Sequence, residues 1–359
     1  MALTITNTIP IITPVYTPLE FTMSSPGCDY MELDVYIGDA NKTAYQGTKR
    51  TIRIVSTSVV ADIQGIVQPF FTSDASGTVQ LFRVDVLGRT VTGGSVTEGY
   101  VDCWWVFNGC KRDTWDPTQF IMDGSGDAKF LNVWSTPIDI HWGQEPKLYF
   151  FQGTFTNNTG SYVANGPSFR VQADGAWSKG LQFNTVSTPQ IREWNVGAAA
   201  LNASIAGLNI TTSTKSYTID PSQNTGSFGL KTINIVPKDE RYTPQRVAFI
   251  DSYGCKEYVN FDLVKTNTVS IKRQTFNNNG ILKQYNNQVE DQYTITSNWI
   301  TEEQSTSLKD LWYSPSVMVG NDYVIIQNKT VNIETRRGSK LINYTAEYQK
   351  SFDFKCQIY

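Results

Sequence analysis

Apolar and polar residues alternate with a period of two through most of the first hundred positions, which is the spacing of strands with one buried face. The expected inward positions in the two clearest segments are Met31, Leu33, Val35 and Ile37, and then Phe82, Val84 and Val86. Further strands are predicted at 51–60, at 63–71 and in the segment that ends at Phe107. Gly, Pro, Asn and Asp turns separate these segments, so residues 1–107 are predicted to form an immunoglobulin-like β-sandwich.

The pattern is less regular in the middle of the chain, over residues 108–205. Strands are expected at 147–155 and 169–175, with turn-rich sequence between them. The stretch from 196 to 207 is small and apolar and has a glycine near each end, which suits either a short helix or a packed linker. We therefore interpret 108–205 as an irregular β-rich middle region and place a boundary between 205 and 206.

Strand periodicity returns in residues 206–359, most clearly in RVAFIDSYGCKEYVNFDL, from Arg246 to Leu263. In the second half of this stretch, Val259 and Phe261 share one side with Leu263, as in a strand with one buried face. Gly254 lies in the break between the two halves, where a turn residue with positive φ is expected. The stretch is predicted to be an antiparallel hairpin.

One helix is predicted within this C-terminal β domain, near residues 301–312. Thr301 followed three residues later by Gln304 is a capping box, and Pro315 ends the helical pattern. An apolar stripe is expected to pack inward at Leu308, Leu311 and Trp312. A polar face is expected to meet solvent or a neighbouring subunit at Glu302, Glu303, Ser307, Lys309 and Asp310. The whole chain is thus predicted to be all-β, ending in an antiparallel sheet or barrel with one packed helix.

Composition narrows the class of protein. Only 18% of the residues are charged, whereas 13% are aromatic, a combination that favours large subunit interfaces. The net charge of −3 argues against a DNA- or RNA-binding protein held by phosphate contacts, and no sequence-specific nucleic-acid partner is expected. The sequence contains no run of about 18 apolar residues, so no membrane-spanning helix is predicted. No secretory signal is expected at the start of the sequence. Five scattered cysteines predict buried free thiols in a reducing cytoplasm rather than a disulfide framework.

The sequence yields no candidate catalytic, cofactor-binding or metal-binding residues. The single histidine, His141, has strand-like flanks and no accompanying nucleophile motif, so it is expected to be a partly buried structural residue. Six residues separate Cys103 from Cys110, which does not match zinc-ligand spacing. The run from Asp123 to Ala128 lacks the later glutamate of a calcium loop and is interpreted as a surface turn.

Two other functions stay open at this point. Tryptophans gather between residues 104 and 142 and could form a sugar-binding platform, namely Trp104, Trp105, Trp115, Trp134 and Trp142. Paired carboxylates for glycoside hydrolysis are set by three-dimensional spacing and leave no sequence motif. A host-surface glycan-binding protein and, less favoured, a cell-wall glycan hydrolase are therefore the alternatives. Aromatic strands more often form a core or a subunit interface than a ligand cradle.

Several segments, taken in order, resemble virion proteins of tailed bacteriophages that infect Bacteroidetes, including the crAss-like group. The hairpin segment RYTPQRVAFIDSYGCKEYVNFDL resembles a recurrent hairpin of those proteins, although Cys255 stands where a second glycine is often found. The other matching segments are DIQGIVQPFF (62–71), WWVFNG (104–109), KFLNVW (129–134), LKDLWYSPSVMV (308–319), YVIIQNKTVNIET (323–335) and KLINYTAEY (340–348). Together they span most of the chain.

The resemblance implies a non-enzymatic structural subunit of a tail or neck assembly. Such a subunit is synthesised in the cytoplasm of the bacterial host and becomes part of the virion. It would form a ring with copies of itself, contact other tail, neck or portal proteins, and surround the path of genome ejection. In such a protein the hairpin around Gly254 is a building block rather than a chemical site.

Overall fold

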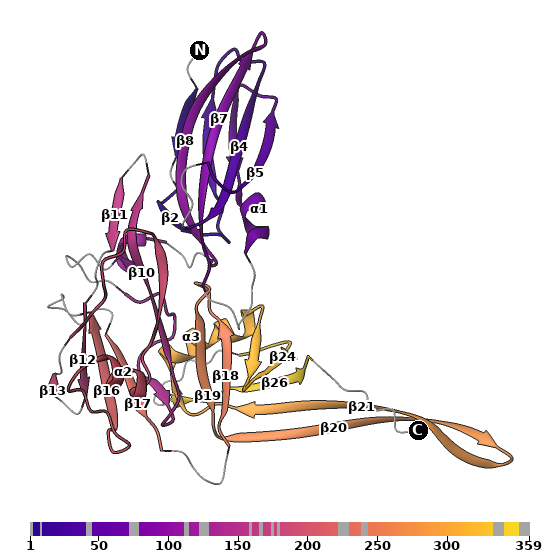
Figure 1. Cartoon of the computed structure of the whole chain (residues 1–359). Helices are drawn as coiled ribbons and strands as arrows, with labels where there is room; N and C mark the ends of the chain where they lie inside the picture. Colours follow the sequence, from indigo (N-terminus) through magenta and orange to yellow (C-terminus); the bar gives the residue numbers. More distant parts are fainter. Residues whose placement is uncertain are drawn as a thin grey trace.

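The computed structural model describes residues 3–7, 9–40, 45–71, 79–110, 115–121, 129–157, 160–164, 168–173, 176–177, 180–221, 230–237, 243–332 and 341–351. Strands make up 54% of the structure and helices 11%, which confirms the all-β class. A β-sandwich stands at one end, a body of further sheets follows, and one long hairpin projects sideways from the body (Figure 1).

The N-terminal unit is a sandwich of two sheets. One sheet has the order β1 (Thr4–Asn7), β3 (Glu20–Ser24), β6 (Ser58–Asp62). The other has the order β2 (Ile12–Pro14), β8 (Ser95–Phe107), β7 (Leu81–Thr92), β4 (Tyr30–Asp39), β5 (Thr48–Ile54). Phe21 of the first sheet stacks on Trp104 of the second, with ring centroids 5.7 Å apart. Alternate residues of β4 are buried from Met31 to Ile37, so the predicted inward face is confirmed.

The strand predicted at 63–71 is wrong. This segment forms α1 (Gln64–Val67) and a 3-10 turn, η1 (Gln68–Phe70). Its buried residues are Ile63, Val67 and Phe71, and a spacing of four follows one side of a helix. The Asp62 carboxylate accepts a hydrogen bond from the Gln64 backbone N–H at 2.9 Å, which favours a turn at this point.

Two sheets form the middle of the body. The first has the order β11 (Ser161–Ala164), β10 (Lys147–Thr156), β15 (Gln190–Asn195). The second contains β13 (Ala176–Trp177), β14 (Leu181–Gln182), β12 (Ser168–Ala173), β16 (Ser216–Pro221), β17 (Lys231–Ile235) and β9 (Ile138–Ile140). A 3-10 turn, η2 (Pro117–Phe120), precedes these two sheets in the chain. The stretch 196–207, which suited either a short helix or a packed linker, contains the helix α2 (Ala198–Ser204). The second sheet takes strands from both sides of the expected 205/206 boundary, and one hydrophobic cluster runs from Phe130 to Tyr348.

The C-terminal sheet is antiparallel and open rather than a barrel. Its order is β19 (Lys256–Phe261), β18 (Gln245–Ile250), β23 (Val317–Val319), β24 (Asp322–Ile326), β26 (Thr345–Lys350), β21 (Ile281–Thr296), β20 (Val264–Asn278). A short pair, β22 (Ile300–Thr301) and β25 (Leu341–Ile342), lies beside α3 (Glu302–Tyr313).

The helix α3 is the one predicted, with the predicted cap. The Gln304 N–H donates to Thr301 Oγ1 at 3.2 Å, and the Thr301 N–H donates to Gln304 Oε1 at 2.9 Å. Leu308 and Leu311 are fully buried, whereas Trp312 is only partly buried.

The expectation that the polar face of α3 meets solvent or a neighbouring subunit is wrong for two residues. Ser307 and Asp310 are buried. Ser307 Oγ donates to the Val133 carbonyl at 3.0 Å, and Asp310 Oδ2 accepts from the Ser252 N–H at 2.8 Å. Because both side chains bond to backbone groups of the body, this side of the helix packs inward as well.

The hairpin β18–β19 is confirmed, and Gly254 in its turn has φ +73°. Within the turn, Gly254 and Cys255 are buried, and Ser252 and Tyr253 are partly buried. A Cβ atom at Gly254 would lie 1.6 Å from the Asn108 carbonyl oxygen, and the Cys110 N–H donates to the Ser252 carbonyl at 2.6 Å. The turn thus packs against the segment that leaves the N-terminal sandwich, and it acts as a structural junction between the two parts of the molecule.

Candidate functional site

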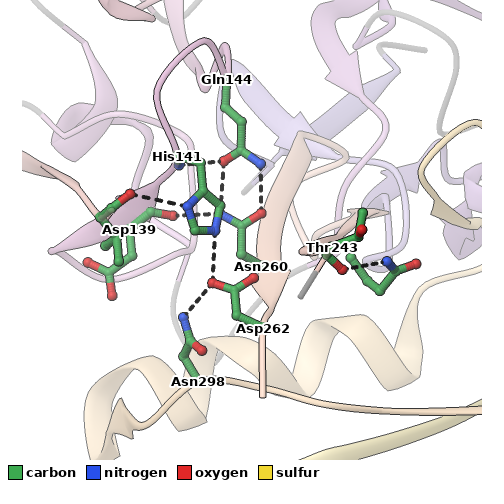
Figure 2. Close-up of polar contacts among 9 residues, drawn as sticks. Asp139, His141, Gln144, Thr243, Asn260, Asp262 and Asn298 are labelled. Atoms are coloured by element: carbon green, nitrogen blue, oxygen red, sulfur yellow. Dashed lines mark hydrogen bonds and ion pairs between the residues drawn. The ribbon is translucent and has the colours of Figure 1, made fainter. Parts of the chain in front are cut away.

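His141 follows β9 and is buried, as expected of a structural histidine. Its Nε2 lies 2.9 Å from Asp262 Oδ2 (Figure 2). Its Nδ1 lies 3.1 Å from the Val236 carbonyl oxygen. Asn298 Nδ2 donates to the same Asp262 oxygen at 2.7 Å. A carboxylate and a carbonyl therefore occupy both ring nitrogens, and neither nitrogen is available to activate a nucleophile.

The loop after His141 is fixed by a pair of side-chain amides. Gln144 Nε2 donates to Asn260 Oδ1 at 2.9 Å, and Asn260 Nδ2 donates back to Gln144 Oε1 at 2.8 Å. The His141 N–H also donates to Gln144 Oε1, at 2.9 Å (Figure 2). The adjacent cavity, bordered by Trp134 and Asp139, has a volume of about 20 Å³, which is room for about one water molecule. This cavity is too small for a sugar or a cofactor.

A second group of titratable side chains lies buried beneath the turn of the β18–β19 hairpin. Lys231, Asp251 and Glu257 come from three different strands or turns and are all buried. Burial raises the pKa of Glu257 and raises the pKa of Asp251 well above its usual range, where the charge of Glu257 adds to the effect. Burial also lowers the pKa of Lys231, although both carboxylates oppose that shift.

The contacts of this group are structural. Glu257 Oε1 accepts from Asn132 Nδ2 at 3.1 Å and from the Trp134 N–H at 3.2 Å. Asp251 Oδ2 accepts from the Val133 N–H at 3.2 Å, and Lys231 Nζ donates to the Trp134 carbonyl at 2.6 Å. The charged groups therefore hold the extended segment 132–134 in place. This arrangement gives the three side chains a packing role.

Replacing Glu257 by glutamine is expected to change how stability depends on pH. A carboxyl group whose folded pKa is raised contributes stability that is fully present below its unfolded value of about 4.3 and is lost as the pH rises through the folded value. Glutamine keeps the Oε1 acceptor and does not titrate, so the Glu257→Gln protein should lose less stability than the parent above about pH 5. Urea unfolding between about pH 5 and pH 8 measures this slope.

The matched control for this prediction is Glu303→Gln, the same chemical change at an exposed position in the first turn of α3. It should leave the slope of stability against pH unchanged. A Glu257→Gln protein with the parent's slope would show that Glu257 does not titrate differently in the folded chain.

The five tryptophans considered as a sugar platform do not form one surface. Trp104, Trp105 and Trp134 are buried in the hydrophobic core. Trp115 is partly buried and its Nε1 donates to the Ile12 carbonyl at 2.6 Å, whereas Trp142 is 46% exposed. The platform expected for a glycan-binding protein is therefore absent at these five positions.

The other sequence candidates supply no ligand site in the part of the chain that the structure describes. Cys103 is buried and its Sγ donates to the Thr156 carbonyl at 3.2 Å, and Cys110 is partly buried. The turn from Asp123 to Ala128 lies outside the described residues. No group of three or more metal-ligating side chains occurs within the described ranges. Within the same ranges, no helix has the length and hydrophobicity to span a bilayer.

The feature that the sequence analysis missed is the projecting hairpin, here called the arm, residues 264–296. Its two strands, β20 and β21, contain 15 and 16 residues, and every side chain of β20 is exposed. The arm leaves the sheet at one edge and extends far beyond the body (Figure 1). Asn279 and Gly280 form its tip with positive φ, the Asn-Gly turn typical of a tight hairpin. That dipeptide was the available signal in the sequence.

Three aliphatic side chains lie together on one face of the arm. Ile271 pairs directly with Val289, and Val269 lies two residues from Ile271 on the same face. Their exposed fractions are 47%, 37% and 49%. At the root, the same face of β21 carries Ile295, which is buried in the core. Val269, Ile271 and Val289, here called the arm stripe, thus continue the buried face of the sheet into solvent.

Charge also distinguishes the arm from the rest of the chain. Four basic and two acidic residues lie between 264 and 296, whereas the whole chain has 30 basic and 33 acidic residues. The arm is therefore net positive and the remainder is net negative.

Comparison with known proteins adds little. No family model matches the chain, and no curated protein matches it. Solved structures with some likeness include the E. coli chaperone DraB (11% identity, 52% of this chain and 97% of that chain covered, TM-score 0.20). A second is the YadV chaperone, with 11% identity, a TM-score of 0.19, and 73% of this chain and 100% of that chain covered. A third is the Salmonella enterica SafA pilin in complex with the SafB chaperone, with 12% identity, a TM-score of 0.20, and 73% of this chain and 96% of that chain covered. TM-scores this low carry no inference about function.

Proposed function

We propose that this protein is a non-enzymatic structural subunit of a tailed-phage virion, part of a ring-like tail or neck assembly through which the genome passes. The observation that carries the proposal is the arm. In this role the arm contacts a neighbouring copy of the chain, and repetition of that contact closes a ring. The ordered resemblance to virion proteins and the low content of charged residues support the same function.

The physical chemistry of the arm favours a partner. A two-stranded hairpin is marginally stable by itself in water, and the distal part of this one is covered by no described part of its own chain. The arm stripe leaves three adjacent aliphatic side chains exposed, which is typical of an interaction surface.

A second copy of the chain is the partner that fits. A net positive arm is complementary to a body that is net negative, and such complementarity steers association. An arm that meets the body of the next copy makes a head-to-tail contact, the kind that generates rings.

Two aspartates on the arm stripe are expected to abolish assembly. Val269→Asp with Ile271→Asp replaces two of the three aliphatic side chains of the arm stripe by charged ones. Loss of an interface hot spot costs about 2 kcal/mol or more, roughly 30-fold in affinity. Light scattering coupled to size exclusion measures the oligomer, and circular dichroism checks that the body still folds.

The matched control is Thr268→Asp with Ser270→Asp, on the opposite face of the same strand. Each double variant adds two negative charges. In the stripe variant the aspartate at position 269 faces Asp291, and in the control the aspartate at position 270 faces Glu290, so the two variants carry similar repulsion within the arm. The control should assemble like the parent. Equal assembly by both variants would remove the stripe from the interface.

The virion role has its own test. Mass spectrometry of purified particles and electron microscopy of their symmetry axis should find the chain in a ring. A parent protein that is monomeric at all concentrations and absent from particles would overturn the proposal. Saturable glycan binding, or cleavage of a cell-wall polymer, would instead support one of the two alternative functions.

A further inference from the structure

The arm has two outer edges, and among the described strands each edge is open over most of its length. β20 is the last strand in the order of its sheet, so its outer edge has no neighbour there. β21 meets β26 only from Tyr293 to Thr296, which leaves the outer edge of β21 open from Ile281 to Gln292. In an antiparallel pair, about every second residue points its backbone N–H and C=O away from the partner strand. Both edges therefore present rows of backbone hydrogen-bonding groups that no described strand meets (Figure 1).

Long open edges of this kind favour pairing with another chain. Folded proteins protect their edge strands by keeping them short, or with proline, bulges or charged side chains. β20 runs for 15 residues, and the arm contains no proline. The arm has one irregularity in its register, between Gln274 and Thr275, and several charged residues. The distribution of those charges decides which edges can meet.

The two strands of the arm differ in charge. β20 carries three basic residues, Lys265, Lys272 and Arg273, and no acidic residue. β21 carries one basic residue, Lys283, and two acidic residues, Glu290 and Asp291. β20 is thus net positive and β21 net negative, although the arm as a whole is positive. Opposite charges that face each other across two strands stabilise the pair, and like charges destabilise it. The edge of β20 is therefore complementary to the β21 of another arm and not to another β20.

The opposite charges also lie at matching distances from the body. Within one arm, Glu290 pairs with Ser270, which is two residues from Lys272 on the same face. A neighbouring arm shifted by two residues therefore places Lys272 directly opposite Glu290 of the next copy. In that register Arg273 and Asp291 of the next copy are diagonal neighbours on the other face, within reach of long side chains.

We propose that the arms of neighbouring copies pair edge to edge, β20 of one copy with β21 of the next, to form one continuous antiparallel sheet. β20 leads away from the body and β21 returns to it, so arms that point the same way bring these two strands together in opposite directions. Each copy offers a different edge to each of its two neighbours, which is a head-to-tail contact. Closure of the ring leaves no edge of the arms unpaired.

This inference rests on the proposed function and specifies how the copies meet. The edges and the faces of a ribbon are separate surfaces, so edge pairing leaves the arm stripe free to contact the neighbouring body. Edge pairing has a consequence that contact between arm and body alone does not have. The two strands of the arm must be complementary to each other between different copies.

Charge reversal on one strand at a time tests the pairing. Lys272→Glu with Arg273→Glu makes β20 acidic, and Glu290→Lys with Asp291→Lys makes β21 basic. Each variant then has two edges of like charge, so each alone should need about a tenfold or higher concentration to assemble. An equimolar mixture should assemble like the parent, because β20 of each variant then meets β21 of the other. Light scattering coupled to size exclusion measures assembly, and circular dichroism checks folding.

The same experiment separates edge pairing from contact with the body. The arm with Glu290→Lys and Asp291→Lys is more positive than the parent arm, so this variant alone would assemble at least as well as the parent if attraction to the negative body were the whole contact. That result would overturn edge pairing, as would a mixture that stays monomeric beside a parent that assembles. A parent that is monomeric at all concentrations would overturn the proposed function and edge pairing together.

Hydrogen exchange of the parent tests edge pairing without any substitution. Edge pairing gives a new hydrogen bond to about every second amide of β20, and the amides between them already bond to β21. The outward amides should exchange about tenfold or more slowly in the assembly than in the dilute chain, with a period of two along the strand. Slowing that is uniform along β20, or absent from it, would overturn edge pairing.

Discussion

Replacing Gly254 by alanine is expected to lower the free energy of unfolding by about 3 kcal/mol or more, because a left-handed conformation and an overpacked contact act together. The residue has φ +73°, which an L side chain rarely adopts. Its Cβ would lie 1.6 Å from the Asn108 carbonyl oxygen, and this neighbour is backbone that cannot rotate away. The turn and the segment that leaves the sandwich must therefore separate. Urea unfolding of the purified chain measures the loss.

Gly320→Ala separates the two causes. Gly320 has φ +63°, and a Cβ atom there meets nothing within 4 Å. This variant should lose only about 1–2 kcal/mol, the cost of the left-handed conformation. If both alanine variants unfold at the same urea concentration, the contact between Gly254 and Asn108 is not a stabilising junction.

Lys231→Met is expected to cost about 3–5 kcal/mol, because it leaves two buried carboxyl groups without their nearby cation. The ammonium also donates to the Asn132 and Trp134 carbonyls, at 3.3 and 2.6 Å, and methionine cannot donate. The loss should be greater at about pH 8 than at about pH 5, because the raised pKa of Glu257 keeps more of that group neutral at the lower pH. Unfolding experiments at both pH values test this difference.

A second substitution checks the cause. Adding Glu257→Gln to Lys231→Met removes one uncompensated charge, so the double variant should regain part of the lost stability at about pH 8. Lys283→Met, at an exposed position of the arm, should change the free energy of unfolding by less than about 0.5 kcal/mol. A Lys231→Met protein as stable as this control would show that the buried cation is dispensable.

Local patterns in the sequence predicted the local parts of the fold. The capping box at Thr301 and the positive φ of Gly254 each depend on a few neighbouring residues, and both were found as predicted. The strand predicted over 63–71 is instead a helix and a 3-10 turn, because Ile63, Val67 and Phe71 have the spacing of one side of a helix. The resemblance to virion proteins stays a prediction.

The buried groups could not be predicted in the same way, because their members are distant in sequence. Glu257 bonds to Asn132, 125 residues away, and His141 bonds to Asp262, 121 residues away. The arm escaped prediction for another reason. A period of two indicates that Val269 and Ile271 share a face, but it does not say whether another part of the protein covers that face.

Because the arm is long, a small rotation at its root moves its tip a long way. The 15 residues of β20, at about 3.3 Å each, give an arm about 50 Å long. A rotation of roughly ten degrees at the root would therefore carry the tip through about 9 Å, close to the spacing of about 10 Å between two packed sheets. A change in one contact at the root that rotates the arm by this angle, such as the 2.9 Å contact between His141 and Asp262, would thus move the tip by about the spacing between two packed sheets. In a ring of such subunits, the angle at which each arm leaves its body would set the diameter of the opening.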